Sequence, residues 1–339
     1  MATSNRARIV CAARSGVLGI TVALFLAVTA CTSMKVKMGM KVYLDRTPVS
    51  AIQVTMPNGA SLAPGEKEPL VVTFTEPGGK TVTTEGAAGG PVMWKELNVS
   101  TELVSFDGKG KLSLASDPRI SDGKSGHVTV TVPSHPELRG DLDIAVDYKR
   151  NYVAVFSGRN GSDGMNGTDG MDGISGSMGS IDPNNPSAGG DGGNGSDGSN
   201  GWDGDRGGDG PPVRVRVAFR AGNNPLLEVS VAAEGRQSFY LVDPHGGSLT
   251  VKSDGGRGGS GGRGGRGGRG GSGGVGSPSG SNGRDGSDGR NGSDGSPGRG
   301  GQITVTYDPQ AGAYLGAIHL SSVRGPVTVF RQEAVAALW

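Results

Sequence analysis

Asp and Asn recur at every third position in three Gly-rich segments, and their oxygen atoms are the ligands that Ca²⁺ takes in proteins. The positions are Asn160, Asp163, Asn166, Asp169 and Asp172; Asp191, Asn194, Asp197, Asn200 and Asp203; and Asn282, Asp285, Asp288, Asn291 and Asp294. Calcium-binding repeats of this kind have a nine-residue period with a recurring apolar residue, and neither feature is present here. We therefore expect no metal site and a structural role for these ladders, with ion binding left open as the alternative.

Other chemical signals in the chain are weaker. The four histidines, His127, His135, His245 and His319, are scattered, and no two stand at the spacing of metal ligands. The string 258–262 matches the spacing of a nucleophile elbow but lacks the surrounding strand, turn and helix. Arg263, Arg266 and Arg269 are spaced as in RNA-binding segments, but no aromatic side chains for base stacking lie between them. The sequence predicts no enzyme activity, no cofactor and no nucleic-acid partner.

The amino terminus has the pattern of a secretory signal. Arg6, Arg8 and Arg14 precede an apolar stretch of about fourteen residues that ends at Ala30. A membrane-spanning helix needs roughly 20 apolar residues, so this stretch favours a cleaved signal over residues 1–30. Removing the three arginines takes the formal charge from +1 to about −2, which predicts no strong attraction to nucleic acid or to anionic membranes.

The residues around the expected cleavage point, Val28-Thr29-Ala30-Cys31, resemble the lipobox of bacterial lipoproteins. The resemblance implies that the Cys31 thiol carries a diacylglycerol, that cleavage precedes it, and that the new amine is acylated. Thr32 follows in place of an Asp, which in such lipoproteins implies sorting to the outer membrane of a Gram-negative bacterium. Ordinary cleavage that leaves Cys31 as a free thiol is the alternative. Because Cys11 lies in the signal, no disulfide is expected in the mature chain.

Residues 31–156 are expected to hold the lipid anchor, a short linker and a β-sandwich-like domain. Alternating or β-branched runs occur at 51–56, 70–75, 111–115, 127–132 and 142–148, with turn signals between them. A second β region, 211–254, predicts a four-strand meander with strands at 213–217, 226–232, 238–242 and 248–252. The last part, 302–339, predicts further strands at 302–307 and 327–330 and a short tail, with one or two helical turns at 333–338.

Glycine makes up 65 of the 339 residues, and most of it lies within residues 157–301 in four runs with a strict period of three. Each run has eight such glycines over 22 residues. Run 1 has Gly158, Gly161, Gly164, Gly167, Gly170, Gly173, Gly176 and Gly179; run 2 has Gly189, Gly192, Gly195, Gly198, Gly201, Gly204, Gly207 and Gly210; run 3 has Gly255, Gly258, Gly261, Gly264, Gly267, Gly270, Gly273 and Gly276; and run 4 has Gly280, Gly283, Gly286, Gly289, Gly292, Gly295, Gly298 and Gly301.

A period of three matches the polyproline-II helix, in which each run would extend roughly 65–70 Å. Such a helix has no internal hydrogen bonds, so its backbone groups need partners elsewhere. The runs resemble bacterial collagen-like Gly-X-Y repeats, which implies a homotrimer. They are also similar to the polyglycine-II folds of phage tail-tip adhesins and an insect antifreeze protein, which implies a bundle within one chain.

Two observations favour the single-chain bundle. Collagen needs Pro at about 15–20% or more, whereas Pro297 is the one Pro within the runs. The runs also have equal length and are joined by turns, as in antiparallel hairpins. We expect run 3, with Gly at two of every three positions, inside the bundle and runs 1 and 4 at its edges. Flexible Gly-rich linkers are the third possibility.

Two further expectations concern how the runs are joined. The strands that flank each hairpin should lie side by side, 152–157 with 213–219 and 248–253 with 302–307. Arg257, Arg263, Arg266 and Arg269 of run 3 should face the Asp and Asn ladders of neighbouring helices.

These features predict a mainly β, non-enzymatic lipoprotein of the cell envelope, monomeric and anchored through lipid, whose rigid Gly-rich bundle has a structural or adhesive role. A ligand-binding β-module on a Gly-rich spacer and a collagen-like homotrimeric stalk remain alternatives. The partner or surface ligand is not identified by the sequence.

Overall fold

The computed structural model describes residues 41–339, which form two compact units, the first ending at Asp147 and the second beginning at Tyr148. The expected signal at 1–30 and Cys31 lie outside the described residues. Within the described part, no helix is long and apolar enough to cross a membrane. The division comes earlier than the boundary expected at 156, because the strand Asn151–Ser157 pairs with a strand of the second unit.

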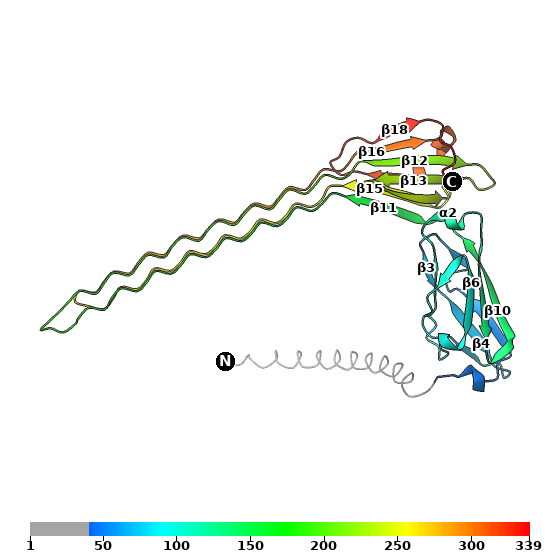
Figure 1. Cartoon of the computed structure of the whole chain (residues 1–339), viewed down its shortest axis with the longest axis horizontal. Helices are drawn as coiled ribbons and strands as arrows, with labels where there is room; N and C mark the ends of the chain where they lie inside the picture. Colours follow the sequence, from blue (N-terminus) through cyan, green and yellow to red (C-terminus); the bar gives the residue numbers. More distant parts are fainter. Residues whose placement is uncertain (1–40) are drawn as a thin grey trace, which may run out of the picture. The chain divides into compact units, whose positions relative to one another are not determined.

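The first unit is built from short strands around one apolar core (Figure 1). Its elements are η1 (Leu44–Arg46), β1 (Ala51–Thr55), β2 (Ser61–Leu62), β3 (Lys67–Pro69), β4 (Val71–Thr75), β5 (Thr81–Thr83), η2 (Trp94–Glu96), β6 (Asn98–Glu102), β7 (Val104–Phe106), β8 (Lys111–Leu114), α2 (Pro118–Ser121), β9 (Gly126–Val132) and β10 (His135–Val146). They form three sheets, with strand orders β1-β4-β5, β2-β10-β9-β6 and β3-β8-β7.

Strand alternation explains how this core forms. In β9, Val128, Val130 and Val132 are fully buried while the residues between them face outward, as the two-residue period of a strand requires. Phe74 of β4 and Trp94 of η2 complete the same core. All five expected strands of this region are present, four of them within one residue of the expected ends, whereas the strand expected at 142–148 begins at His135 and ends at Val146.

The second unit has two sheets that share a core. Its elements are β11 (Asn151–Ser157), β12 (Val213–Arg220), β13 (Leu226–Ala233), β14 (Arg236–Val242), β15 (Ser248–Asp254), β16 (Ile303–Tyr307), η3 (Pro309–Ala317), β17 (Ile318–Ser321) and β18 (Val329–Gln332). One sheet is β11-β15-β17, with parallel pairs throughout, and the other is β14-β13-β12-β16-β18. Phe156 and Val251 from the first sheet pack with Val215, Val229 and Ile303 from the second.

Three expectations about this unit are wrong. The meander has three strands, β12, β13 and β14, because β15 belongs to the other sheet. The strands flanking one hairpin do not pair with each other; instead β11 pairs with β15 and β12 with β16, both in parallel. Residues 333–338 are not helical. Their extended course lets the Leu338 N–H donate to the buried Glu228 carboxylate at 2.7 Å.

Candidate functional site: the paired glycine runs

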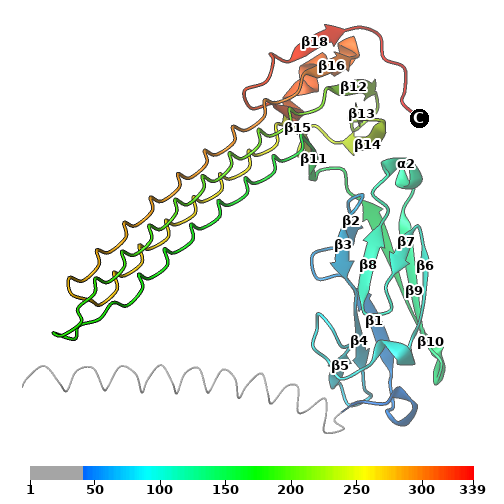
Figure 2. The same cartoon turned by 60° about the vertical axis from the view of Figure 1, so that its left-hand side comes forward.

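The four glycine runs extend from the sheets of the second unit, after β11 and β15 and before β12 and β16, and lie side by side along their whole length (Figures 1 and 2). They are extended and belong to no helix or strand. Residues 180–188 join run 1 to run 2, and residues 277–279 join run 3 to run 4. The two connectors also contact each other, since the Ser277 N–H donates to the Ser187 carbonyl at 2.9 Å.

Backbone hydrogen bonds join the runs at every triplet. Runs 1 and 3 are parallel partners, as in the Gly167 N–H that donates to the Arg263 carbonyl at 2.7 Å. Runs 2 and 4 form a second parallel pair, as in the 2.9 Å bond from Gly198 N–H to the Ser287 carbonyl. The antiparallel pairs are bonded too. N–H groups of run 2 donate to carbonyls of run 1, those of run 3 donate to run 2, and those of run 4 donate to run 3, in each case every three residues.

The same bonds fix the order of the runs. Runs 2 and 3 each bond to all three other runs, whereas no hydrogen bond between residues 158 and 301 joins run 1 to run 4. Runs 2 and 3 are therefore central, and runs 1 and 4 lie at opposite edges. Run 3 carries the buried line of glycines, at Gly256, Gly259, Gly262, Gly265, Gly268, Gly271 and Gly274.

The glycine pattern follows from how closely the backbones approach. A Cβ at Gly265 would lie 2.0 Å from the Thr168 carbonyl oxygen of run 1, and one at Gly264 would lie 2.1 Å from the Gly289 oxygen of run 4. No side chain fits at either distance. Run 3 therefore needs two glycines in each triplet, and its third position, which carries Arg263 or Arg266, is exposed.

The Asp and Asn ladders accept hydrogen bonds from backbone N–H groups of the adjacent run. In run 1, Asp169 Oδ1 accepts from the Arg266 N–H at 2.8 Å, and Asn160, Asp163, Asn166 and Asp172 bond to run 3 in the same way. Asp191, Asn194, Asp197, Asn200 and Asp203 of run 2 serve run 4. Asn282, Asp285, Asp288, Asn291 and Asp294 of run 4 serve run 3.

This pattern corrects the expected role of Arg257, Arg263, Arg266 and Arg269. Within the part of the chain that the structure describes, no ion pair joins their side chains to the ladders. Instead, the ladders accept from the backbone N–H groups of these arginines. The acceptor is an amide oxygen at Asn160 and Asn166 and a carboxylate oxygen at Asp169 and Asp172. A short Asp or Asn side chain reaches the neighbouring backbone and satisfies a donor that would otherwise lack a protein partner.

Every N–H of a central triplet in run 3 has a partner. Gly265 donates to the Ser199 carbonyl, Arg266 to Asp169 and Gly267 to Asp288, all at 2.8–2.9 Å. Successive positions therefore bond to runs 2, 1 and 4. The three neighbouring runs thus supply an acceptor for every N–H of this triplet, which has no hydrogen bonds of its own.

The sheets and the runs share one register. Asn151 of β11 pairs with Ser248 of β15, and Asn160 of run 1 accepts from Arg257 of run 3; both pairs are 97 residues apart. Val213 and Ile303 in β12 and β16 are 90 residues apart, as are Asp191 and Ser281 in runs 2 and 4. The parallel strand pairs thus set the alignment of the parallel run pairs, which is why strands within one hairpin do not pair.

A polar cluster on the first unit is a second candidate site. His127 of β9 faces Asp143 and Asp141 of β10, with Nδ1 2.7 Å from Asp143 Oδ1 and Nε2 3.2 Å from Asp141 Oδ1. Asp141 also accepts from Thr129 and Arg139. Strand alternation places all these side chains on one outward face. The scatter of histidines along the sequence had hidden this cluster, whose signal is the two-residue spacing within each of the paired strands.

The cluster favours the protonated, positively charged form of the His127 imidazole. The hydrogen bond to Asp143 raises the pKa of His127, although desolvation opposes it and Asp141 adds to it. The Arg139 guanidinium and the Thr129 hydroxyl hold the pKa of Asp141 well below its usual range. With carboxylates at both ring nitrogens, His127 has no free nitrogen with which to act as a general base.

We expect the pKa of His127, followed by NMR titration of its ring protons, to exceed the ordinary value of 6.5. A raised folded-state pKa means that the stabilisation from this cluster is complete below pH 6.5 and is lost as the pH rises through the folded-state pKa. Asp143→Asn should move the pKa back toward its ordinary value, and Asp107→Asn, elsewhere on the same unit, should leave it unchanged. A wild-type midpoint at or below 6.5 would contradict this assignment.

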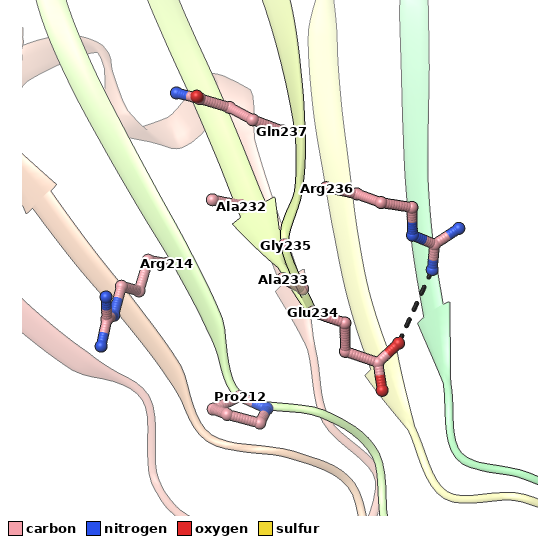
Figure 3. A pocket seen from close by; sticks show the side chains of 8 residues that line it. All are labelled: Pro212, Arg214, Ala232, Ala233, Glu234, Gly235, Arg236 and Gln237. Atoms are coloured by element: carbon pink, nitrogen blue, oxygen red, sulfur yellow. Dashed lines mark ion pairs between the residues drawn. The ribbon is translucent and has the colours of Figure 1, made fainter.

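A pocket beside the β13–β14 turn is the third candidate, lined by Pro212, Arg214, Ala232, Ala233, Glu234, Gly235, Arg236 and Gln237. Figure 3 shows the Arg214 and Arg236 side chains on opposite sides of it. Arg236 pairs with Glu234 at 3.8 Å. The titratable side chains of this pocket do not converge on one point, so it offers no catalytic constellation.

No family model matches the chain, and no curated protein matches its sequence. The glycine runs, bonded to one another at every triplet, are the most extensive ordered feature of the described residues outside the two cores.

Proposed function

We propose that this chain is an exported, non-enzymatic lipoprotein, held to the outer membrane by lipid on Cys31, whose four glycine runs form a polyglycine-II bundle with a structural or adhesive role. The observation that carries the proposal is the bonding of the runs to one another at every triplet. It supplies within one chain the partners that polyproline-II backbones lack. A collagen trimer would take those partners from two other chains.

The bonding also supports a rigid element. Gly loses more backbone freedom on ordering than any other residue, so a Gly-rich segment stays ordered only if its contacts offset that cost. Here the compensation comes from backbone bonds of 2.7–3.0 Å between runs and from the Asp and Asn acceptors. A stiff, polar, extended surface presented from a membrane anchor suits adhesion or a structural layer.

The lipid anchor is tested by replacing Cys31, whose sulfur atom would carry the diacylglycerol. Cys31→Ser should abolish incorporation of labelled palmitate and release the chain from the membrane fraction, whereas Thr32→Ser should change neither. Membrane association and labelling that persist in Cys31→Ser would refute the lipid anchor.

The role of the bundle is tested with the full lipid-anchored chain. Cells that display a Gly262→Val, Gly265→Val, Gly268→Val variant should lose binding to the target surface or the integrity of the envelope layer. Cells with Arg263→Ala, Arg266→Ala, Arg269→Ala, exposed in the same run, keep the bundle intact. If the glycine variant behaves as the wild type at equal surface abundance, the bundle is not the functional element.

A further inference from the structure

One side of the paired runs differs chemically from the others. Runs 1 and 2 are antiparallel neighbours, with the Trp202 N–H donating to the Met165 carbonyl at 2.9 Å. The side chains that follow Gly in their triplets meet along this pair: Thr168 Oγ1 lies 3.1 Å from Ser199 Oγ, and a Cβ at Gly193 would lie 3.2 Å from Ile174 Cγ1. We call this surface the run 1–run 2 face.

The run 1–run 2 face is uncharged over most of its length and combines large apolar side chains with small hydroxyl side chains and glycines. Its residues are Met165, Thr168, Met171, Ile174 and Ser177 from run 1 and Trp202, Ser199, Ser196, Gly193 and Gly190 from run 2. Met165 and Trp202 are each 65% exposed, and Met171 and Ile174 are each 82% exposed. Their combined apolar surface is on the order of several hundred Å², a size at which exposed patches mark interaction sites.

The remaining sides are charged. The Asp and Asn ladders line the contacts of run 1 with run 3, of run 2 with run 4, and of run 4 with run 3. The arginines of run 3 occupy its exposed third position. Covering such a surface would remove many charged groups from water, which is costly. The run 1–run 2 face carries no charge between Met165 and Ser177, so a second copy of this chain could cover it without that cost.

We propose that the run 1–run 2 face is the interface of a homodimer, in which the same face of a second copy of this chain covers Met165, Met171, Ile174 and Trp202. A twofold axis parallel to the runs would place run 1 of each copy over run 2 of the other. Across from Met171 and Ile174 on run 2 are the small residues Ser196 and Gly193, so in the dimer these two large side chains would lie over small residues of the other copy.

The two copies also match in length and period. Both faces repeat every three residues, about 9 Å, over roughly 68 Å, so the contacts stay in step from end to end. With no axial shift, Met165 of one copy meets Trp202 of the second, a favourable sulfur–aromatic contact. A face of this length and two runs wide is on the scale of the ~800 Å² per partner that stable interfaces bury, and twofold dimers are the commonest oligomers.

The test uses the full mature chain in mild detergent and compares Ile174→Asp with Met178→Asp by sedimentation equilibrium. Met178 is the matched control, because it is in the same run and also 82% exposed, but it lies in the third position of its triplet, beside run 3. We expect the wild type and Met178→Asp to be dimers. Ile174→Asp should dimerise about tenfold more weakly or less still, a change of ~1.4 kcal/mol or more.

Cross-linking in intact membranes identifies the face directly. Co-expressed chains that carry Met171→Cys on one and Ser196→Cys on the other should form a disulfide-linked pair, whereas two chains with Arg266→Cys should not. A wild type that stays monomeric at ~100 μM, forms a trimer, or binds vesicles through this face while monomeric would overturn the proposal. So would an undiminished dimer in Ile174→Asp.

This inference rests on the proposed bundle but not on its adhesive role. Amide protection in run 3 of the Ile174→Asp variant reports the bundle separately from the dimer. Dimers with no adhesion would refute the adhesive role alone, and monomers with protected amides would refute the interface alone.

Discussion

Gly265→Ala should destabilise the glycine runs by ~3 kcal/mol, the upper part of the range for overpacking a close contact. Its Cβ would lie 2.0 Å from the Thr168 carbonyl oxygen and 2.4 Å from the carbonyl carbon, both backbone atoms that cannot rotate away. Run 1 must then move off run 3, and the bonds of neighbouring triplets are lost with it. The measurement is urea unfolding followed by NMR signals from runs 1 and 3.

Two controls isolate the steric cause. Gly316→Ala introduces the same methyl group at a position in η3 with no atom within 4 Å and should change the unfolding free energy by less than ~0.5 kcal/mol. Arg266→Ala removes an exposed side chain from the adjacent position and should also have little effect. Unchanged stability in Gly265→Ala would mean that runs 1 and 3 do not approach as described.

Arg220→Met should cost about 3–5 kcal/mol of unfolding free energy, because it leaves a buried carboxylate without its cation. Glu228 is 2% exposed and bonds to the Arg220 guanidinium, with Nε at 2.8 Å. Its other oxygen accepts from the Leu338 N–H, so the same pair secures the carboxyl-terminal segment, where Trp339 lies over Arg220. Urea unfolding of the full chain measures the loss.

A second variant separates charge from packing. Arg220→Met with Glu228→Gln keeps an acceptor for Leu338 and removes the unpaired charge, so it should recover most of the lost stability. Arg216→Met, four residues away on the same strand and exposed, should be nearly neutral. If Arg220→Met is as stable as Arg216→Met, the buried ion pair does not hold this sheet and tail together.

The strands were largely predictable from sequence because alternation and β-branching are local signals. Val213 to Val217 alternates cleanly and forms β12. Which strands pair was not predictable in this way, since the partners of β11 and β12 are 97 and 90 residues away. That choice depends on contacts between distant segments, because the parallel strand pairs and the parallel run pairs share one register. The tail at 333–338 was misjudged for the same reason, because Glu228 holds it extended.

The glycine positions were evident from their period, but the role of Asp and Asn was not. A ladder such as Asp163, Asp169 and Asp172 suggests charge pairing with Arg263 and Arg266 when only sequence is considered. In the structure the acceptors serve backbone N–H groups. The physical clue was the number of N–H donors: in each triplet of run 3 between 259 and 270 a backbone carbonyl accepts from one N–H, and the other two, as at Arg266 and Gly267, are bonded by short Asp or Asn side chains at matching spacing.

Amide hydrogen exchange along run 3 distinguishes a bundle within one chain from the alternatives. We expect protection at all three positions of each triplet between 261 and 270, as for Gly265, Arg266 and Gly267, which donate to runs 2, 1 and 4. A collagen-like trimer would protect one position per triplet, because only the axial Gly packs against its neighbours. Such a pattern, or exchange at the rate of an unstructured peptide throughout the run, would contradict the single-chain bundle.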